Sequence, residues 1–277
     1  MISAIIPCFN CIRSLDKTIA SLMKANVKLE IFIIDDGSSD ASADFARKKY
    51  PGIKLLINEK NRGRAFSRNR GMAAAGNNVM LFIDSDVWPG NGCLEQLYEN
   101  ISDNDIVYPK LAYEDGAVKH PKDDNSSYPY DAGCFMIKMP DGKDVKFDEN
   151  FKYLEDQDFF IRCHLNNFKA KYVRSAVAFH SNRQTTSSGS EKFYQEMCDI
   201  VYGMNKYRGK KIKPVHNFSR VNLVKGLVAA IFNYNYFFYG PSASVLKKIS
   251  RLFLKHKKFE ISNFKMLRLY FKALKNL

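Results

Sequence analysis

Short apolar runs alternate with segments of helical periodicity along the first part of the chain. The apolar runs predict four strands, at residues 3–10, 28–35, 53–57 and 79–83. The intervening segments predict helices at residues 14–24, from the Asp36–Asp40 turn to Lys49, and at residues 65–75. Strands that alternate with helices of this length favour an α/β fold, in which right-handed crossovers connect a mainly parallel sheet.

The second part of the chain continues with longer and less regular connections. Helices are predicted at residues 94–100 and from Glu155 onward, and strands at residues 106–109, 131–138 and 173–179. Residues 114–129 are polar and rich in turn formers, without periodicity. Long loops of this kind are usually binding loops or lids, so we expect this one to border a ligand site.

Carboxylates follow two of the predicted strands. Asp35 and Asp36 end the second strand, and Asp84 and Asp86 directly follow the fourth. Open α/β sheets bind ligands at the carboxyl ends of their strands, so both pairs are predicted to lie at one edge of the sheet. An Asp-x-Asp pair there could share Mg²⁺ or Mn²⁺ with substrate phosphates, or it could simply cap the following loop.

Two common nucleotide-binding motifs are absent from the sequence. No Gly-x-Gly-x-x-Gly follows the first strand, and no Gly-Lys-Ser/Thr phosphate loop occurs. The sequence therefore disfavours a dinucleotide-binding Rossmann protein and a P-loop NTPase. What remains is a nucleotide site in which a metal ion holds the diphosphate.

Four motifs occur in unbroken order in the first part of the chain. They are Ile5-Ile-Pro-Cys-Phe-Asn10, Ile34-Asp-Asp-Gly-Ser-Ser-Asp40, Asn61-Arg-Gly-Arg-Ala-Phe-Ser-Arg-Asn69 and Phe82-Ile-Asp-Ser-Asp86. Each motif alone is weak, but together they resemble the donor-binding half of family 2 glycosyltransferases with the GT-A fold. The resemblance implies a mixed, mainly parallel Rossmann-like sheet flanked by helices, and a UDP-, GDP- or dTDP-linked sugar as donor.

The resemblance also implies roles for individual residues. Base and ribose would contact Pro7, Phe9, Asn10 and Asp36, and the nucleotide and its diphosphate would contact Arg64 and Arg68. Asp84, with Ser85 beside it, would face the ribose and the metal ion, and Asp86 would bind Mn²⁺ or Mg²⁺ directly. The residues alone leave open that the two arginines belong to a solvated helix face.

A second acidic cluster opens the helix predicted from Glu155. Glu155, Asp156 and Asp158 lie in its first turn, where the helix dipole by itself favours acidic residues. The segment resembles the Glu-Asp-x-Asp motif of the same family, which implies that Asp156 is the general base. An inverting transfer needs such a carboxylate to take the proton of the attacking hydroxyl. Glu155 and Asp158 would support it or touch the acceptor.

His180 directly follows the strand predicted at residues 173–179. A lone histidine after a strand is commonly structural, but the resemblance implies a metal ligand that acts together with Asp86. Imidazole suits Mn²⁺ somewhat better than Mg²⁺ because it is a softer donor than a carboxylate. The Ser- and Thr-rich residues 183–189 would form a flexible loop that closes over the diphosphate.

The cysteines and the N-terminus indicate a reducing compartment. Of the six cysteines only Cys8 and Cys11 are closely spaced, and no second pair completes a zinc site, so we expect reduced thiols. The first residues have neither a basic segment nor the apolar run of a signal peptide. We therefore expect a cytoplasmic protein.

The charge of the chain is concentrated at its C-terminal end. The net charge is +14 over 277 residues, yet residues 207–277 hold 16 basic residues and one acidic residue. Residues 1–206 hold 27 basic and 28 acidic residues. We therefore predict a catalytic domain at residues 1–206, with a donor half at about 1–90 and an acceptor half at 91–206, followed by a basic helical extension at 207–277.

The extension contains two basic amphipathic segments, residues 246–258 and 264–277. This profile is typical of helices that lie on an anionic membrane surface. Helices packed on the catalytic domain are an alternative. A nucleic acid is a less favoured partner, because the extension is richly apolar and has no recognised nucleic-acid motif.

The sequence thus predicts a metal-dependent inverting glycosyltransferase peripheral to the inner face of the cell membrane, with a lipid-linked or membrane-associated glycan as acceptor. A polyprenyl-phosphate sugar synthase is an alternative, because its acceptor is already ionised and needs no base. A nucleic-acid-binding protein with a nucleotide-sensing α/β domain is an alternative of another class, and the Glu-Asp-x-Asp segment argues against it. The sequence gives no prediction of the oligomeric state.

Overall fold

The computed structural model describes residues 1–120, 129, 132–140, 142, 144–181, 195–196, 199, 202–203 and 206–207. Contacts divide the chain into two compact units, Met1–Thr185 and Thr186–Leu277, and the predicted boundary at 206/207 falls within the second. The predicted loop at 183–189 and the amphipathic segments at 246–258 and 264–277 lie outside the described residues. No helix in the described part of the chain is long and apolar enough to span a bilayer.

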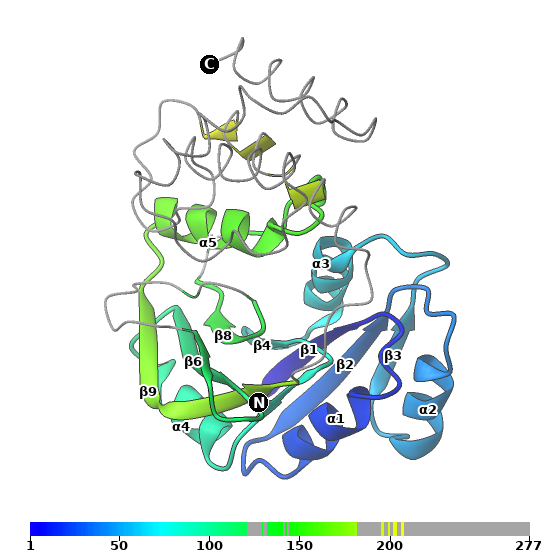
Figure 1. Ribbon diagram of the computed structural model, residues 1–277. Coiled ribbons are helices and arrows are strands. Elements are labelled where there is room, and N and C mark those ends of the chain that lie inside the picture. The colour runs from blue at the N-terminus through cyan, green and yellow to red at the C-terminus, as the bar shows by residue number, and fades with distance from the viewer. Residues whose placement is uncertain are drawn as a thin grey trace, which may run out of the picture. The chain divides into compact units, whose positions relative to one another are not determined.

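The first unit is built on one nine-stranded sheet (Figure 1). Its strands are β1 (Ile2–Cys8), β2 (Leu29–Asp35), β3 (Lys54–Ile57), β4 (Val79–Ile83), β5 (Val87–Pro89), β6 (Ile106–Tyr113), β7 (Val118–His120), β8 (Cys134–Lys138) and β9 (Ala170–His180). Their order is β3-β2-β1-β4-β8-β6-β9-β5, and β7 pairs with β6. Strands β1 to β4 are mutually parallel, whereas β8 runs antiparallel to β4 and β6. The predicted α/β fold with a mixed sheet is confirmed.

Helices cover both faces of the sheet and create two cores. Helices α1 (Leu15–Met23), α2 (Ser42–Lys49) and α4 (Cys93–Asn100) pack on one face, and α3 (Arg64–Ala74) and α5 (Glu155–Leu165) on the other (Figure 1). Alternate residues of a strand point to opposite faces, so Ala4 and Ile6 of β1 join the first core while Ile5 joins the second. Each face of the sheet is therefore covered by its own packed core.

The C-terminal part of the sheet differs from the predicted strands. Strand β9 continues through His180, which is therefore its last residue and not the first residue of a loop. Strand β5 was not predicted, since a three-residue segment that contains Pro89 has no readable alternation. Proline is tolerated there because, in the part of the chain that the structure describes, β5 lies at the edge of the sheet and pairs with β9 alone.

Candidate active site

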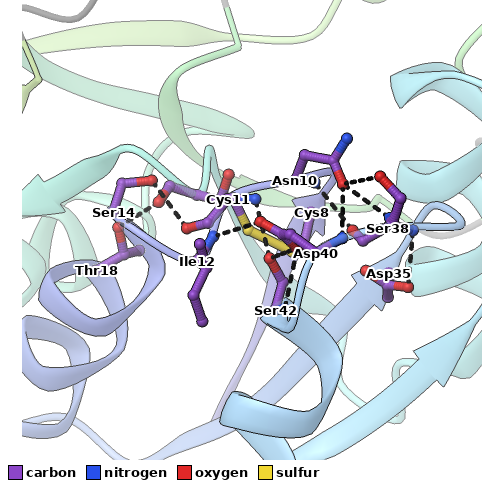
Figure 2. The surroundings of a disulfide bond; sticks show 12 residues. Cys8, Asn10, Cys11, Ile12, Ser14, Thr18, Asp35, Ser38, Asp40 and Ser42 are labelled. Atoms are coloured by element: carbon purple, nitrogen blue, oxygen red, sulfur yellow. Dashed lines mark hydrogen bonds between the residues drawn. A yellow bond between two sulfur atoms is a disulfide. The ribbon is translucent and has the colours of Figure 1, made fainter.

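The loop after β1 is fastened to the turn after β2. Asn10 has a left-handed backbone conformation, with φ of 50°, which asparagine tolerates better than most residues. Its Oδ1 accepts the backbone N–H groups of Ser39 (2.8 Å) and Asp40 (3.2 Å), and its own N–H donates to Ser38 Oγ (2.9 Å) (Figure 2). Asn10 therefore joins the two loops that were predicted to hold the nucleoside.

Phe9 and Pro7 flank this loop in different environments. Phe9 is 49% exposed, an unusual degree for a phenylalanine, and it leaves an apolar ring surface open next to Asn10. Pro7 lies within β1, opposite Ile34 of β2, where its ring is buried. Pro7 is thus part of the buried sheet, whereas the ring of Phe9 is accessible at the surface.

A disulfide joins Cys8 to Cys11 across the same loop (Figure 2). The expectation that all cysteines are free thiols is therefore wrong for this pair. The turn at Asn10 brings the two Cα atoms to 6.0 Å, within the usual span of a disulfide. Among the described residues, Cys93, Cys134 and Cys163 are buried and lie outside this disulfide.

Asp36 organises the next loop of the site. Its buried carboxylate accepts hydrogen bonds from Asn58 Nδ2 (2.7 Å) and from the backbone N–H groups of Arg62 (2.9 Å) and Gly63 (2.8 Å). Gly63 adopts φ of +91°, a conformation that favours glycine. Asp36, predicted to contact base and ribose, thus holds the loop that leads into α3.

Asp35 was not among the predicted site residues, although its neighbour Asp36 was. It is only 2% exposed, and its Oδ2 accepts the backbone N–H of Ser38 at 3.2 Å. Its Oδ1 is buried without a hydrogen-bond partner among the described residues. Buried carboxylate oxygens normally have a donor, so this atom is a natural acceptor for a ligand N–H. No pattern in the sequence distinguishes it from Asp36.

An ion network connects α3, the loop after β4 and the start of α5. Arg68 is 1% exposed, and it donates from Nη2 to Asp84 Oδ1 (2.8 Å) and from Nη1 to Glu155 Oε1 (2.7 Å). Arg64, one turn earlier on α3, reaches the same Glu155 oxygen with Nε at 3.1 Å. Burial opposes the charge of Arg68, but the carboxylates of Asp84 and Glu155 more than offset it and raise the pKa of Arg68.

The three carboxylates in the first turn of α5 have different partners. Asp156 is 7% exposed, and its Oδ2 accepts the backbone N–H of Ala132 at 3.3 Å. Asp158 is fully buried and forms an ion pair with Arg162 on the next turn of the same helix, with Nε 2.8 Å from Oδ2. Glu155 faces the arginines of α3.

Asp86 and His180 lie together because β5 pairs antiparallel with β9. The pairing places Val87 opposite His180, and Asp86 Oδ2 lies 3.7 Å from His180 Nε2. His180 Nδ1 lies 2.6 Å from the carbonyl oxygen of Ser181. A carbonyl only accepts, so a hydrogen bond there places the proton on Nδ1 and leaves the Nε2 lone pair toward Asp86 in the neutral ring.

The Asp84-Ser85-Asp86 loop surrounds Asp86 with charged and polar groups. Burial raises the pKa of Asp86, opposed by His180 and assisted by the charge of Asp84. The carbonyl of Ser85 accepts the hydroxyl of Thr18 at 3.0 Å, which fastens the Asp-x-Asp loop to α1. In the described part of the chain, no three His, Cys, Asp or Glu side chains are grouped closely enough to hold a metal ion by themselves.

Comparison with known proteins places this chain among sugar transferases. The model of the family described as glycosyl transferase family 2 matches residues 3–160. The poly(ribitol-phosphate) beta-N-acetylglucosaminyltransferase TarP of Staphylococcus aureus (strain N315) is 33% identical over 244 residues, covering 76% of this chain and 75% of TarP.

Two solved structures have the same fold. TarS 1-349 of S. aureus in complex with UDP-GlcNAc has a TM-score of 0.61 at 18% identity, covering 98% of this chain and 81% of TarS 1-349. The mannosyltransferase PcManGT from Pyrobaculum calidifontis, in complex with GDP-Man and Mn²⁺, has a TM-score of 0.61 at 16% identity, covering 99% of this chain and 86% of PcManGT. These likenesses confirm the predicted GT-A fold, and with the family match they show that the chain is a glycosyltransferase and belongs to glycosyl transferase family 2.

Proposed function

We propose that this enzyme transfers a sugar from a nucleotide-sugar to a hydroxyl acceptor with inversion at the anomeric carbon. The observation that carries the proposal is the Arg68 bridge between Asp84 and Glu155. It holds the first turn of α5, which contains Asp156, next to the Asp-x-Asp loop. The candidate base and the candidate diphosphate-binding loop would therefore be parts of the same active site.

The nucleoside would bind between the loops after β1 and β2. The exposed ring of Phe9 offers an apolar surface for the base. Asp35 Oδ1, which has no hydrogen-bond partner within the described ranges, would accept an N–H of the base. Uracil, thymine and guanine all carry such an N–H, so the feature is compatible with UDP-, dTDP- and GDP-sugars. Asp36 and Asn10 would shape this pocket through the loops they hold.

The diphosphate would lie near Arg64 and the Asp-x-Asp loop. Arg64 has a side chain that is 43% exposed, so its guanidinium could turn toward a phosphate while α3 stays in place. Arginine suits this role because its planar donors match phosphate oxygens.

Mn²⁺ or Mg²⁺ would be held by Asp86 and His180, with Asp84 nearby. The two side chains fit such an ion, since the Nε2 lone pair faces a carboxylate oxygen and the carbonyl of Ser181 sets the ring. Phosphate oxygens of the donor would complete the coordination. When bound, the ion would neutralise charge on the departing nucleoside diphosphate.

Asp156 would act as the general base. The acceptor hydroxyl oxygen forms a bond to the anomeric carbon while the bond from that carbon to the diphosphate oxygen breaks, and the hydroxyl proton passes to the Asp156 carboxylate. Glu155 cannot easily replace it, because two guanidinium groups occupy its carboxylate. Asp158 supports the turn through its ion pair with Arg162.

The acceptor would be a lipid-linked or membrane-associated glycan. The support is the concentration of 16 basic residues in the segment 207–277, which suits an anionic surface. A polyprenyl phosphate remains the alternative acceptor, and it would need no base.

The donor is identified by a thermal-shift screen of UDP-GlcNAc, UDP-galactose, GDP-mannose and dTDP-glucose, each with and without Mn²⁺. A sugar nucleotide that binds the native state raises the melting temperature by mass action, and the shift should grow when Mn²⁺ is present. The matching free nucleoside diphosphate is the control for the sugar. Absence of a shift with every nucleotide would contradict the proposed function.

A further inference from the structure

We propose that Arg68 is a positioning residue that sets the distance between the diphosphate site and the general base, and that it is not a ligand of the donor. The inference rests on the proposed function, because it gives Arg68 a task within that reaction. It replaces the role in nucleotide binding that family resemblance implies for this residue.

Arg68 lacks the access that a donor ligand needs. Its side chain is 1% exposed, and its two Nη atoms bind Asp84 and Glu155. A phosphate that displaced Glu155, whose side chain is 1% exposed, would break a buried ion pair, which is unfavourable; Asp84, whose side chain is 21% exposed, is the more accessible partner. Arg64 lies one turn away on the same helix, is far more exposed and is better placed to meet the donor.

The guanidinium itself is held in one orientation. Its Cζ lies 5.3 Å from the centre of the Phe147 ring, which stacks on Phe159 of α5 with ring centres 4.1 Å apart. Asn69, the next residue of α3, forms two hydrogen bonds with the backbone of Phe147. Its side-chain Nδ2 donates to the Phe147 carbonyl (2.9 Å), and its Oδ1 accepts the Phe147 N–H (2.8 Å). Arg68 thus bridges two carboxylates while its guanidinium lies near a packed pair of aromatic rings.

This bridge joins the two chemical halves of the site. Asp84 is two residues before the candidate metal ligand Asp86, and Glu155 directly precedes the candidate base Asp156. A planar guanidinium can hold both carboxylates at once, whereas an ammonium group is a single point charge on a flexible stem. Loss of the bridge should therefore let the start of α5 shift relative to the donor while donor affinity changes little.

The test compares Arg68→Lys with Arg70→Lys in the full chain. Arg70 lies on the same helix and donates to the carbonyl of Ile57 and to Asn58, so it controls for the same chemical change outside the bridge. The assay is nucleotide release from UDP-GlcNAc and GDP-mannose to water, with Mn²⁺. For Arg68→Lys we expect kcat to fall roughly 100-fold, the loss typical of a small misplacement, with donor KM nearly unchanged. Arg70→Lys should retain kcat.

A double-variant cycle separates positioning from simple stabilisation. Glu155→Gln approaches the same bridge from its other end and serves if Arg68→Lys does not fold. The combined variant should lose less kcat than the product of the two single losses, because the two variants share the Arg68–Glu155 contact. Losses that multiply, or a loss confined to the melting temperature with kcat intact, would overturn the proposal.

Hydrogen exchange gives a readout that does not depend on turnover. Arg68→Lys should raise amide exchange in residues 155–158 relative to Arg70→Lys, because the anchor of the first turn of α5 is lost. Equal exchange in the two variants would contradict the positioning role. If the unmodified enzyme binds and turns over no nucleotide-sugar, the proposed function fails, whereas the exchange result still decides whether Arg68 anchors α5.

Discussion

Glu155 and Asp156 are adjacent in the sequence but have different partners. Glu155 is 1% exposed and shared by Arg64 and Arg68, so it has no room for an acceptor hydroxyl. Asp156 accepts backbone N–H groups on both oxygens, that of Ala132 on Oδ2 (3.3 Å) and that of Gln157 on Oδ1 (2.7 Å), whereas the two arginines form their ion pairs with Glu155. At the residue scale, these different partners favour Asp156 over Glu155 as the proposed base.

Asp156→Asn should lower transfer by at least about 100-fold, because general base catalysis commonly contributes that much. Donor binding should persist, since the proton is taken only in the transition state. The thermal shift with the identified donor measures binding, and nucleotide release measures turnover. Turnover equal to that of the unmodified enzyme would move the base elsewhere, and full activity on a polyprenyl phosphate alone would favour the synthase alternative.

The metal proposal is tested at Asp86 and His180. Asp86→Ala and His180→Ala should each abolish the Mn²⁺-dependent part of the thermal shift and reduce transfer, because each removes one of the two side chains proposed to bind the ion directly. Asp44→Ala is a matched control, since Asp44 is an exposed carboxylate paired with Arg47 on α2. Full turnover by metal-stripped enzyme in the presence of a chelator would refute the metal requirement.

At the scale of elements, loops that lie far apart in the sequence depend on one another for their conformation. The loop after β1 is bound to the turn after β2 through Asn10, and that turn is bound to the loop before α3 through Asp36. Gly37 lies at this junction with φ of +73°, and a Cβ there would come within 2.7 Å of the Lys60 backbone. The packed loops leave no space for a side chain at this position.

Gly37→Ala should therefore destabilise the fold by about 1–3 kcal/mol, the usual cost of backbone strain of this kind. It should also weaken donor binding, because the three loops form the proposed nucleoside site. Gly76→Ala is the control, since a Cβ at Gly76 has nothing within 4 Å. Urea unfolding of both variants gives the free energies, and equal stability would show that the loops can separate at little cost.

At the scale of the whole molecule, the dominant feature is the separation of charge along the chain. Residues 1–206 are nearly neutral, whereas residues 207–277 have a net charge of +15. Basic residues near an anionic leaflet contribute about 1 kcal/mol each, and salt weakens the attraction. This asymmetry supports a peripheral position at the inner face of the membrane, where a lipid-linked acceptor would be found.

Full-length protein should sediment with vesicles of anionic lipid at low salt, and less at high salt. Replacing Lys255, Lys257 and Lys258 with Gln should reduce the bound fraction, because these charges belong to one amphipathic segment. Replacing Lys24, Lys48 and Lys49 with Gln is the control for total charge. If replacing Lys255, Lys257 and Lys258 left the sedimented fraction unchanged, the proposed membrane-binding role of the extension would be contradicted. Binding to RNA without binding to vesicles would favour a nucleic-acid partner.

The sequence by itself determined the fold class, the alternation of strands and helices as far as β4 and the positions of the acidic motifs, but neither β5 nor β7, which lies within the predicted loop at residues 114–129. Apolar periodicity reports which residues are buried in each element, so β4 at Val79–Ile83 and α5 from Glu155 were predictable. The motifs were readable because each is a short continuous segment.

Only the tertiary structure decided which side chains meet. Arg68 contacts Glu155 across 87 positions, and Asp86 lies near His180 only because the unpredicted β5 pairs with β9. The same is true of the burial of Asp35 Oδ1 and of the disulfide between Cys8 and Cys11, which depend on how the loops fold over one another. Local patterns specify burial and conformation along the chain, whereas these contacts arise from packing between distant segments, which no local pattern records.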